Sequence, residues 1–263
     1  MNGKEETREL VRKRYGDIAS NSSEGCGCGS GCCCSDAAFD IREASKSVGY
    51  DETDLDSVPM QANMGLGCGN PVAIAGIREG DTVLDLGSGG GFDCFLAARR
   101  AGETGRVIGV DMTPEMIKLS RSNVQKIGYT NVEFRLGEIE HLPVADGSVD
   151  VIISNCVINL SPEKQQVFHE AFRVLKHGGR ISVSDVVATA ELPADVKGDL
   201  AMLAGCIAGA EHTENIRRML ENAGFMNIRM TPKDNSREII KTWVPDRNVE
   251  DFVASYIIEA EKP

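Results

Sequence analysis

The sequence predicts an α/β protein with a seven-stranded, mostly parallel sheet and helices on both of its faces. Three observations support this prediction. Short β-rich runs alternate with helical segments from residue 81 onward, which is typical of parallel strands joined by crossover helices. A glycine-rich loop joins the first strand to the first long helix, where open α/β sheets bind nucleotides. After residue 190 the alternation stops, and two helical segments precede two final strands.

The strands are expected where apolar, β-branched runs are bounded by Gly, Asp or Asn. They are DTVLDLG (81–87), RVIGVD (106–111), NVEFRLGE (131–138), VDVIISN (149–155), RISVSDV (180–186), FMNIRM (225–230) and FVASYIIEA (252–260). Helices between them are expected over Phe92–Ala101, Thr113–Ile127 and Pro162–Leu175, the last followed by Gly178 and Gly179 as a helix-ending pair.

The remaining segments divide the chain into four parts. Residues 1–70 hold an amphipathic helix over 4–18, a flexible Cys/Gly-rich arm, an acidic loop at 51–56 and a connector. Residues 71–190 form the core, which opens with a helix capped by Asn70. Residues 191–224 are an insertion of two helices, capped near Pro193 and Thr213, and residues 225–263 complete the sheet.

Composition excludes several classes of function. The net charge of −12, from 28 basic and 40 acidic residues, repels nucleic acid and anionic lipid, so a small-molecule substrate is expected. No apolar run reaches membrane-spanning length, and the charged N-terminus lacks the apolar centre of a signal peptide. We therefore expect a cytoplasmic protein, in which nine cysteines indicate soft-metal or redox chemistry.

The glycine loop VLDLGSGGGFD departs from a dinucleotide fingerprint, because Phe92 stands where the last glycine would be. Its pattern from Asp85 to Gly91 is D-x-G-x-G-x-G, which resembles motif I of class I S-adenosylmethionine (SAM)-dependent methyltransferases. The resemblance implies that the glycines admit the methionine part of SAM and that Asp85 helps to hold its ammonium group. Asp111, which ends the second strand, could bind both ribose hydroxyls. The expected SAM-contacting residues are Asp85, Gly87, Ser88, Gly89, Gly91, Asp111, Met112, Glu138, Ile139 and Asn155.

Two of these assignments have an equally good alternative. In the family, a loop after the third strand lines the adenine, which makes Glu138 and Ile139 candidates. A plain surface loop would explain the same residues.

Three cysteines are placed where a substrate would lie. Cys68 precedes a helix N-terminus, Cys156 follows the fourth strand, and Cys206 lies in the small-residue stretch GCIAGA of the insertion. Cys94, inside a helix, is expected to be a packed core thiol. None of the four histidines is an obvious general base.

With these cysteines, the chain resembles the arsenite methyltransferases. The most specific segments are GLGCG, DLGSGGGFDC, GVDMT, SNCVINLSPEKQQV, VLKHGG and GCIAGA. The resemblance implies that Cys68, Cys156 and Cys206 bind trivalent arsenic, with the 191–224 insertion as part of the arsenic-binding region. It also implies that an N-terminal cysteine forms a disulfide with Cys68.

The chemistry of arsenic is consistent with this site. Trivalent arsenic prefers thiolates, and its lone pair can attack a methyl group without a general base. Re-reducing the pentavalent product takes two electrons, which two thiols supply by forming a disulfide. We expect Cys32, Cys33 or Cys34 to reach Cys68, with Cys28 and Cys26 as further relay candidates, and a thioredoxin- or glutathione-type reductant to restore them.

Two other functions and two other roles of the cysteine tract remain open. The chain could methylate another small molecule, or it could bind soft metals and SAM without transfer. The tract at 26–34 could be a passive tail or, less compatible with its C-x-C and C-C-C spacing, a zinc site.

Overall fold

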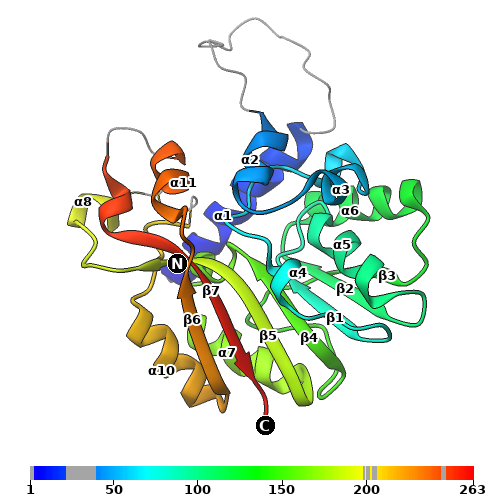
Figure 1. The fold of residues 1–263 in the computed structure, drawn as a ribbon. Helices are drawn as coiled ribbons and strands as arrows, with labels where there is room; N and C mark the ends of the chain where they lie inside the picture. Colours follow the sequence, from blue (N-terminus) through cyan, green and yellow to red (C-terminus); the bar gives the residue numbers. More distant parts are fainter. Residues whose placement is uncertain (1–2, 22–39, 198, 200–201, 203–205, 244–246) are drawn as a thin grey trace, which may run out of the picture.

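The computed structural model describes residues 3–21, 40–197, 199, 202, 206–243 and 247–263. Seven strands form one sheet in the order β3-β2-β1-β4-β5-β7-β6 (Figure 1). Strands β1 to β5 are parallel, and β7 runs antiparallel to both β5 and β6. The predicted fold class is therefore confirmed. The strands are β1 (Thr82–Leu86), β2 (Arg106–Asp111), β3 (Val132–Leu136), β4 (Val149–Asn155), β5 (Leu175–Ala188), β6 (Met226–Pro232) and β7 (Val253–Glu261).

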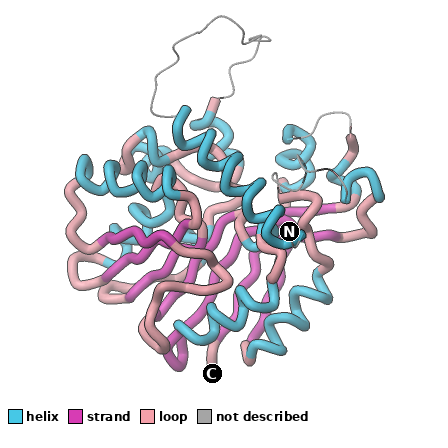
Figure 2. The backbone as a smooth tube through the Cα atoms, turned by 180° about the vertical axis from the view of Figure 1, so that it is seen from behind, coloured by secondary structure: helices cyan, strands magenta, loops and turns pink. Residues whose placement is uncertain are grey.

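Alternation along the central strands gives the sheet two buried faces. Leu84 and Ile152 belong to one core, which packs against α7 (Lys164–Val174) and α10 (Thr213–Ala223). Val83 and Val151 belong to the other, which packs against α5 (Phe92–Ala101). Adjacent residues of a strand point to opposite faces, so near-continuous apolar strands require helices on both sides, as Figures 1 and 2 show.

The other elements surround the carboxyl ends of the parallel strands or continue the outer layers. α1 packs against α6 and against the short 3₁₀ helix η2. These elements are α1 (Gly3–Asn21), α2 (Ile41–Ser47), α3 (Glu52–Asp56), α4 (Pro71–Ile74), α6 (Pro114–Ile127), α8 (Ala194–Lys197), α11 (Ser236–Trp243), η1 (Met60–Ala62), η2 (Ile158–Leu160) and η3 (Val249–Asp251).

Two local predictions were wrong, and one helix was not predicted. The acidic segment 51–56 is not a loop, because the Asp51 carboxylate accepts the backbone N–H of Asp54 at 2.7 Å and begins α3. Gly178 and Gly179 do not end a helix, since α7 ends at Val174 and the glycines lie within β5, where its register with β4 shifts. The helix α11 lies between the two final strands and was not expected.

Candidate active site

A cavity of about 440 Å³ lies where the parallel strands end. Residues of the glycine loop line it together with the ends of β2 and β4, and α1 contributes Arg8, Val11 and Tyr15. The topology explains this position, because open α/β sheets form a crevice outside the carboxyl ends of the strands, at the point where the strand order reverses. Here β1 has β2 on one side and β4 on the other.

The glycine loop has a backbone that only glycine adopts easily. Gly87, Gly89 and Gly91 have φ values of 72°, 49° and 94°, in the left-handed region that disfavours residues with a Cβ. A Cβ on Gly87 would also lie 2.4 Å from a methyl group of Val157. The Gly89 N–H donates to the Asp111 carboxylate at 3.0 Å, so the loop is held against the end of β2.

Buried acids surround one end of the cavity. The Tyr50 hydroxyl donates to the Asp93 carboxylate at 2.7 Å, and the Asn155 amide donates to both residues at 2.9 and 3.2 Å. Burial raises the pKa of Asp93 to about 6, although the hydrogen bonds from Tyr50 and Asn155 act in the opposite direction. Burial and the nearby Asp93 charge raise the pKa of Asp85 well above its usual value.

This donor and acceptor set fits SAM. Ser88 lines the cavity, and its hydroxyl, which packs against Gly109, is buried without a hydrogen-bond partner. Asp85, Asp93 and Asp111 also line the cavity, and carboxylates suit a ligand that carries cationic groups and ribose hydroxyls.

Only some of the other residues predicted to contact SAM line the cavity. Met112, Ile139 and Asn155 line the cavity, whereas Gly91 and Glu138 are not among the lining residues. Glu138 instead pairs with Arg12 at 3.3 Å and with Arg8 at 3.7 Å, both from α1. Gly91 is the N-cap of α5.

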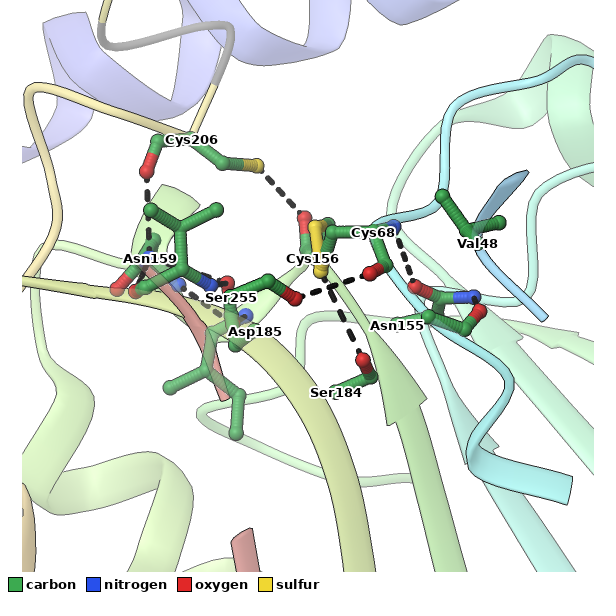
Figure 3. Close-up of a disulfide and its surroundings, with 12 residues drawn as sticks. Val48, Cys68, Asn155, Cys156, Asn159, Ser184, Asp185, Cys206 and Ser255 are labelled. Carbon is green, nitrogen blue, oxygen red and sulfur yellow. Dashed lines mark hydrogen bonds between the residues drawn. A yellow bond between two sulfur atoms is a disulfide. The ribbon is translucent and has the colours of Figure 1, made fainter. Parts of the chain in front are cut away.

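Cys68 and Cys156 form a disulfide next to this cavity (Figure 3). Asn155 links their two chain segments, since its side-chain oxygen accepts the Cys68 N–H at 3.0 Å. The partner of Cys68 therefore differs from the N-terminal cysteine expected from the sequence. The candidate relay residues Cys26, Cys28, Cys32, Cys33 and Cys34 lie outside the described residues.

Cys206 lies beside the disulfide. Its thiol donates to the Cys156 carbonyl at 2.7 Å, and all three cysteines belong to one buried cluster. Burial and the neighbouring Asp185 carboxylate raise the pKa of the Cys206 thiol well above its usual value, and a hydrogen bond from Tyr15 opposes them. Two of the three sulfurs are bonded to each other, and within the described ranges no three His, Cys, Asp or Glu side chains are arranged to hold a metal ion.

Cys94 is buried, as predicted, but it is not a purely apolar core residue. Its thiol donates to the Asp85 carboxylate at 3.2 Å on the side of β1 that faces α5. His212, the histidine nearest to other candidates, is the N-cap of α10 and accepts the Glu214 N–H.

Sequence reasoning missed the polar residues behind the site. Tyr50 and Asp93 bind Asn155 from separate segments, and Asp185 holds η2 from β5. An acid within the alternating run ISVSDVV of the fifth strand was the available signal for Asp185. Tyr15 of α1, which sequence reasoning did not single out for the site, also lines the cavity.

Residues 77–224 match a family model described as a methyltransferase domain. An arsenite methyltransferase of Halobacterium salinarum is 55% identical over 265 residues, which cover 98% of this chain and 67% of the relative. The chain belongs to the arsenite methyltransferase family.

Other members of this family and of its fold are also similar. An arsenite methyltransferase of Aquipseudomonas alcaligenes is 36% identical over 84% of this chain and 63% of its own length. The crystal structure of an arsenic(III) SAM methyltransferase from Chlamydomonas reinhardtii has a TM-score of 0.63 and 34% identity, covering 86% of this chain and 75% of that one. A phosphoethanolamine N-methyltransferase from Haemonchus contortus, with 18% identity and a TM-score of 0.63, shares the fold.

Family membership makes this chain a SAM-dependent methyltransferase. The chain spans about two thirds of its Halobacterium relative, so the substrate is treated below as a proposal. Among the described helices, none is long and apolar enough to cross a membrane.

Proposed function

We propose that the protein methylates trivalent arsenic, first as arsenite and then as methylarsenite. One observation supports this proposal most strongly. Three buried cysteines from three separate segments lie together at the rim of the SAM cavity, and Cys156 lines the cavity itself. Thiolates are the preferred ligands of a soft ion. The names of the relatives give the same substrate class.

SAM supplies an electrophilic methyl group when it is bound. The residues that would hold it are Asp85, Ser88, Asp93 and Asp111, with the glycine loop giving close access to the backbone. Cys68, Cys156 and Cys206 would hold arsenic as thiolates after the Cys68–Cys156 bond is reduced. Arsenic then presents its lone pair, so no side chain has to remove a proton.

The disulfide fits the electron balance of such a reaction. Methyl transfer to the arsenic lone pair raises arsenic from the trivalent to the pentavalent state. Returning it takes two electrons, and the oxidation of two thiols to one disulfide provides them. Cys68 and Cys156 are close enough to be that pair. Tract thiols and a thioredoxin- or glutathione-type reductant in the cytoplasm would restore them.

The proposal is tested by incubating the purified protein with arsenite, isotopically labelled SAM and a dithiol reductant. Labelled methylarsenicals are expected, and their formation should be lost in Cys156→Ser. SAM binding without methylated arsenic would refute the proposal and favour a sensor. Methylation of other small molecules by the Cys156→Ser variant would favour a different substrate.

A further inference from the structure

A buried side-chain pair connects the segments that carry Cys156 and Cys206. Asn159 lies in η2, three residues after Cys156, and Asp185 lies in β5. The side-chain amide of Asn159 donates to the Cys206 carbonyl at 3.2 Å, to the Asp185 carboxylate at 3.0 Å and to the Val186 carbonyl. Figure 3 shows this amide below the Cys206 backbone.

Asp185 fixes the orientation of this amide. Its carboxylate also accepts the backbone N–H groups of Ile158 at 3.0 Å, Asn159 at 3.4 Å and Val186 at 2.8 Å. Asp185 and Asn159 are both buried. Burying a carboxylate and an amide costs more free energy than burying apolar side chains of similar size, so this arrangement indicates a role beyond filling space.

Cys206 needs an external support for its backbone. Its φ of 64° lies in the left-handed region that residues with a Cβ rarely adopt. Two contacts tie it to the Cys156 segment, namely the thiol bond to the Cys156 carbonyl and the Asn159 bond to its own carbonyl. A thiolate bound to arsenic has no proton to donate, so of these two contacts only the Asn159 bond would persist when a substrate is held.

We propose that Asn159, oriented by Asp185, is the positioning residue that holds Cys206 beside Cys156. The inference rests on the proposed function, because it assumes that this thiol pair holds arsenic. It assigns the pair a built-in spacing that does not depend on Cys68.

The test compares two thiol pairs in otherwise matched proteins. In both, serines replace the five tract cysteines, and the buffer contains a non-thiol reductant. One protein carries Cys68→Ser and retains Cys156 and Cys206, whereas the other carries Cys206→Ser and retains Cys68 and Cys156. Phenylarsine oxide, which bonds to two thiols, is titrated into each, with the single tryptophan, Trp243, as a fluorescent reporter at the cavity.

Asn159→Ala should weaken phenylarsine oxide binding at least tenfold in the Cys68→Ser protein. It should change the affinity less than twofold in the Cys206→Ser protein, which also shows that the variant is folded. Asn159→Ser, which keeps a hydroxyl near Asp185 but is too short to bond Cys206, should give the same difference. Asn131→Ala is the matched control, since that amide also donates to two carbonyls, those of Gly102 and Gly105, and it should change neither affinity.

Equal weakening in both proteins, or no weakening in either, would overturn the inference. A Cys68→Ser parent that does not bind phenylarsine oxide would also overturn it, because the Cys156–Cys206 pair would not exist as a site. The proposed function is judged separately, by whether the unmodified protein forms methylated arsenic from arsenite and SAM.

Discussion

Reduction of the Cys68–Cys156 disulfide should lower the stability of the protein by an amount set by the loop it closes. The two cysteines are 88 residues apart. In the chain-entropy description, a cross-link of this span stabilises the folded state by about 4.5 kcal/mol at 25 °C, because it restricts the unfolded chain. This is a large share of the 5–15 kcal/mol that is typical of a domain.

Urea unfolding, followed by Trp243 fluorescence, measures this difference. The protein for this assay has serines at the five tract cysteines, so that they cannot exchange with the disulfide. We expect the free energy of unfolding to fall by about 3–5 kcal/mol when a non-thiol reductant is added, since measured values often lie below the entropic limit. The dependence on urea should become steeper, because the reduced unfolded chain exposes more surface.

Two variants decide the interpretation. Cys156→Ser should have the stability of the reduced protein and should not respond to reductant. Cys94→Ser should retain the full response, because Cys94 is a free cysteine. A response that persists in Cys156→Ser, or one that is absent from the parent protein, would refute the reasoning and show that these two sulfurs are not bonded in solution.

Three further predictions concern binding. Gly87→Ala should weaken SAM binding, measured by calorimetry, at least tenfold. Gly128 has a similar φ of 81° with open space around it, so Gly128→Ala should have the same backbone cost of about 1–2 kcal/mol without a change in SAM affinity. Equal SAM affinities of the two variants would contradict the cavity assignment. Because the pKa of Asp93 is raised to about 6, its carboxylate is charged at pH 7 and mostly neutral at pH 5, so SAM affinity should fall about tenfold over this range. Asp93→Asn should bind weakly and with little pH dependence, and a variant that keeps the parent pH profile would exclude Asp93. Cys206→Ser should weaken arsenite binding at least tenfold while SAM binding is retained, and Cys94→Ser should affect neither. An unchanged arsenite affinity in Cys206→Ser would show that Cys206 does not bind arsenic.

The sequence predicted the parallel core well, because its signals are local. Each of the first five strands is an apolar run next to a turn residue, and the glycine loop has the left-handed φ values for which glycine is required. The same reasoning placed Cys156 at the end of β4 and Asp111 at the end of β2. The carboxyl ends of the strands of a parallel sheet lie at one edge, so the sequence alone predicts that these residues lie near each other.

Contacts between distant segments could not be predicted in this way. The pairing of Cys68 with Cys156 depends on how the loop before α4 returns over β4, and no periodicity encodes that path. The amide of Asn159 reaches Cys206 across 47 positions of sequence. Acidic runs usually favour a solvated loop, and a loop was therefore predicted at Asp51. The Asp51 carboxylate instead accepts the Asp54 N–H and caps a short helix.

The backbone of the two thiol-bearing turns has a consequence for how variants are chosen. Cys156 and Cys206 have φ values of 56° and 64°, where a Cβ costs about 1–2 kcal/mol per residue that glycine would not bear. At Cys206, which is a free cysteine, a selection for thermal resistance alone should therefore favour glycine, at the expense of the chemistry, whereas at Cys156 the loss of the disulfide outweighs this gain. A glycine substitution at Cys206 would give a catalytically silent protein that is better suited than the serine variant to crystallisation with SAM. If a screen for function retains cysteine at such a position, the residue is kept for its sulfur rather than for its packing.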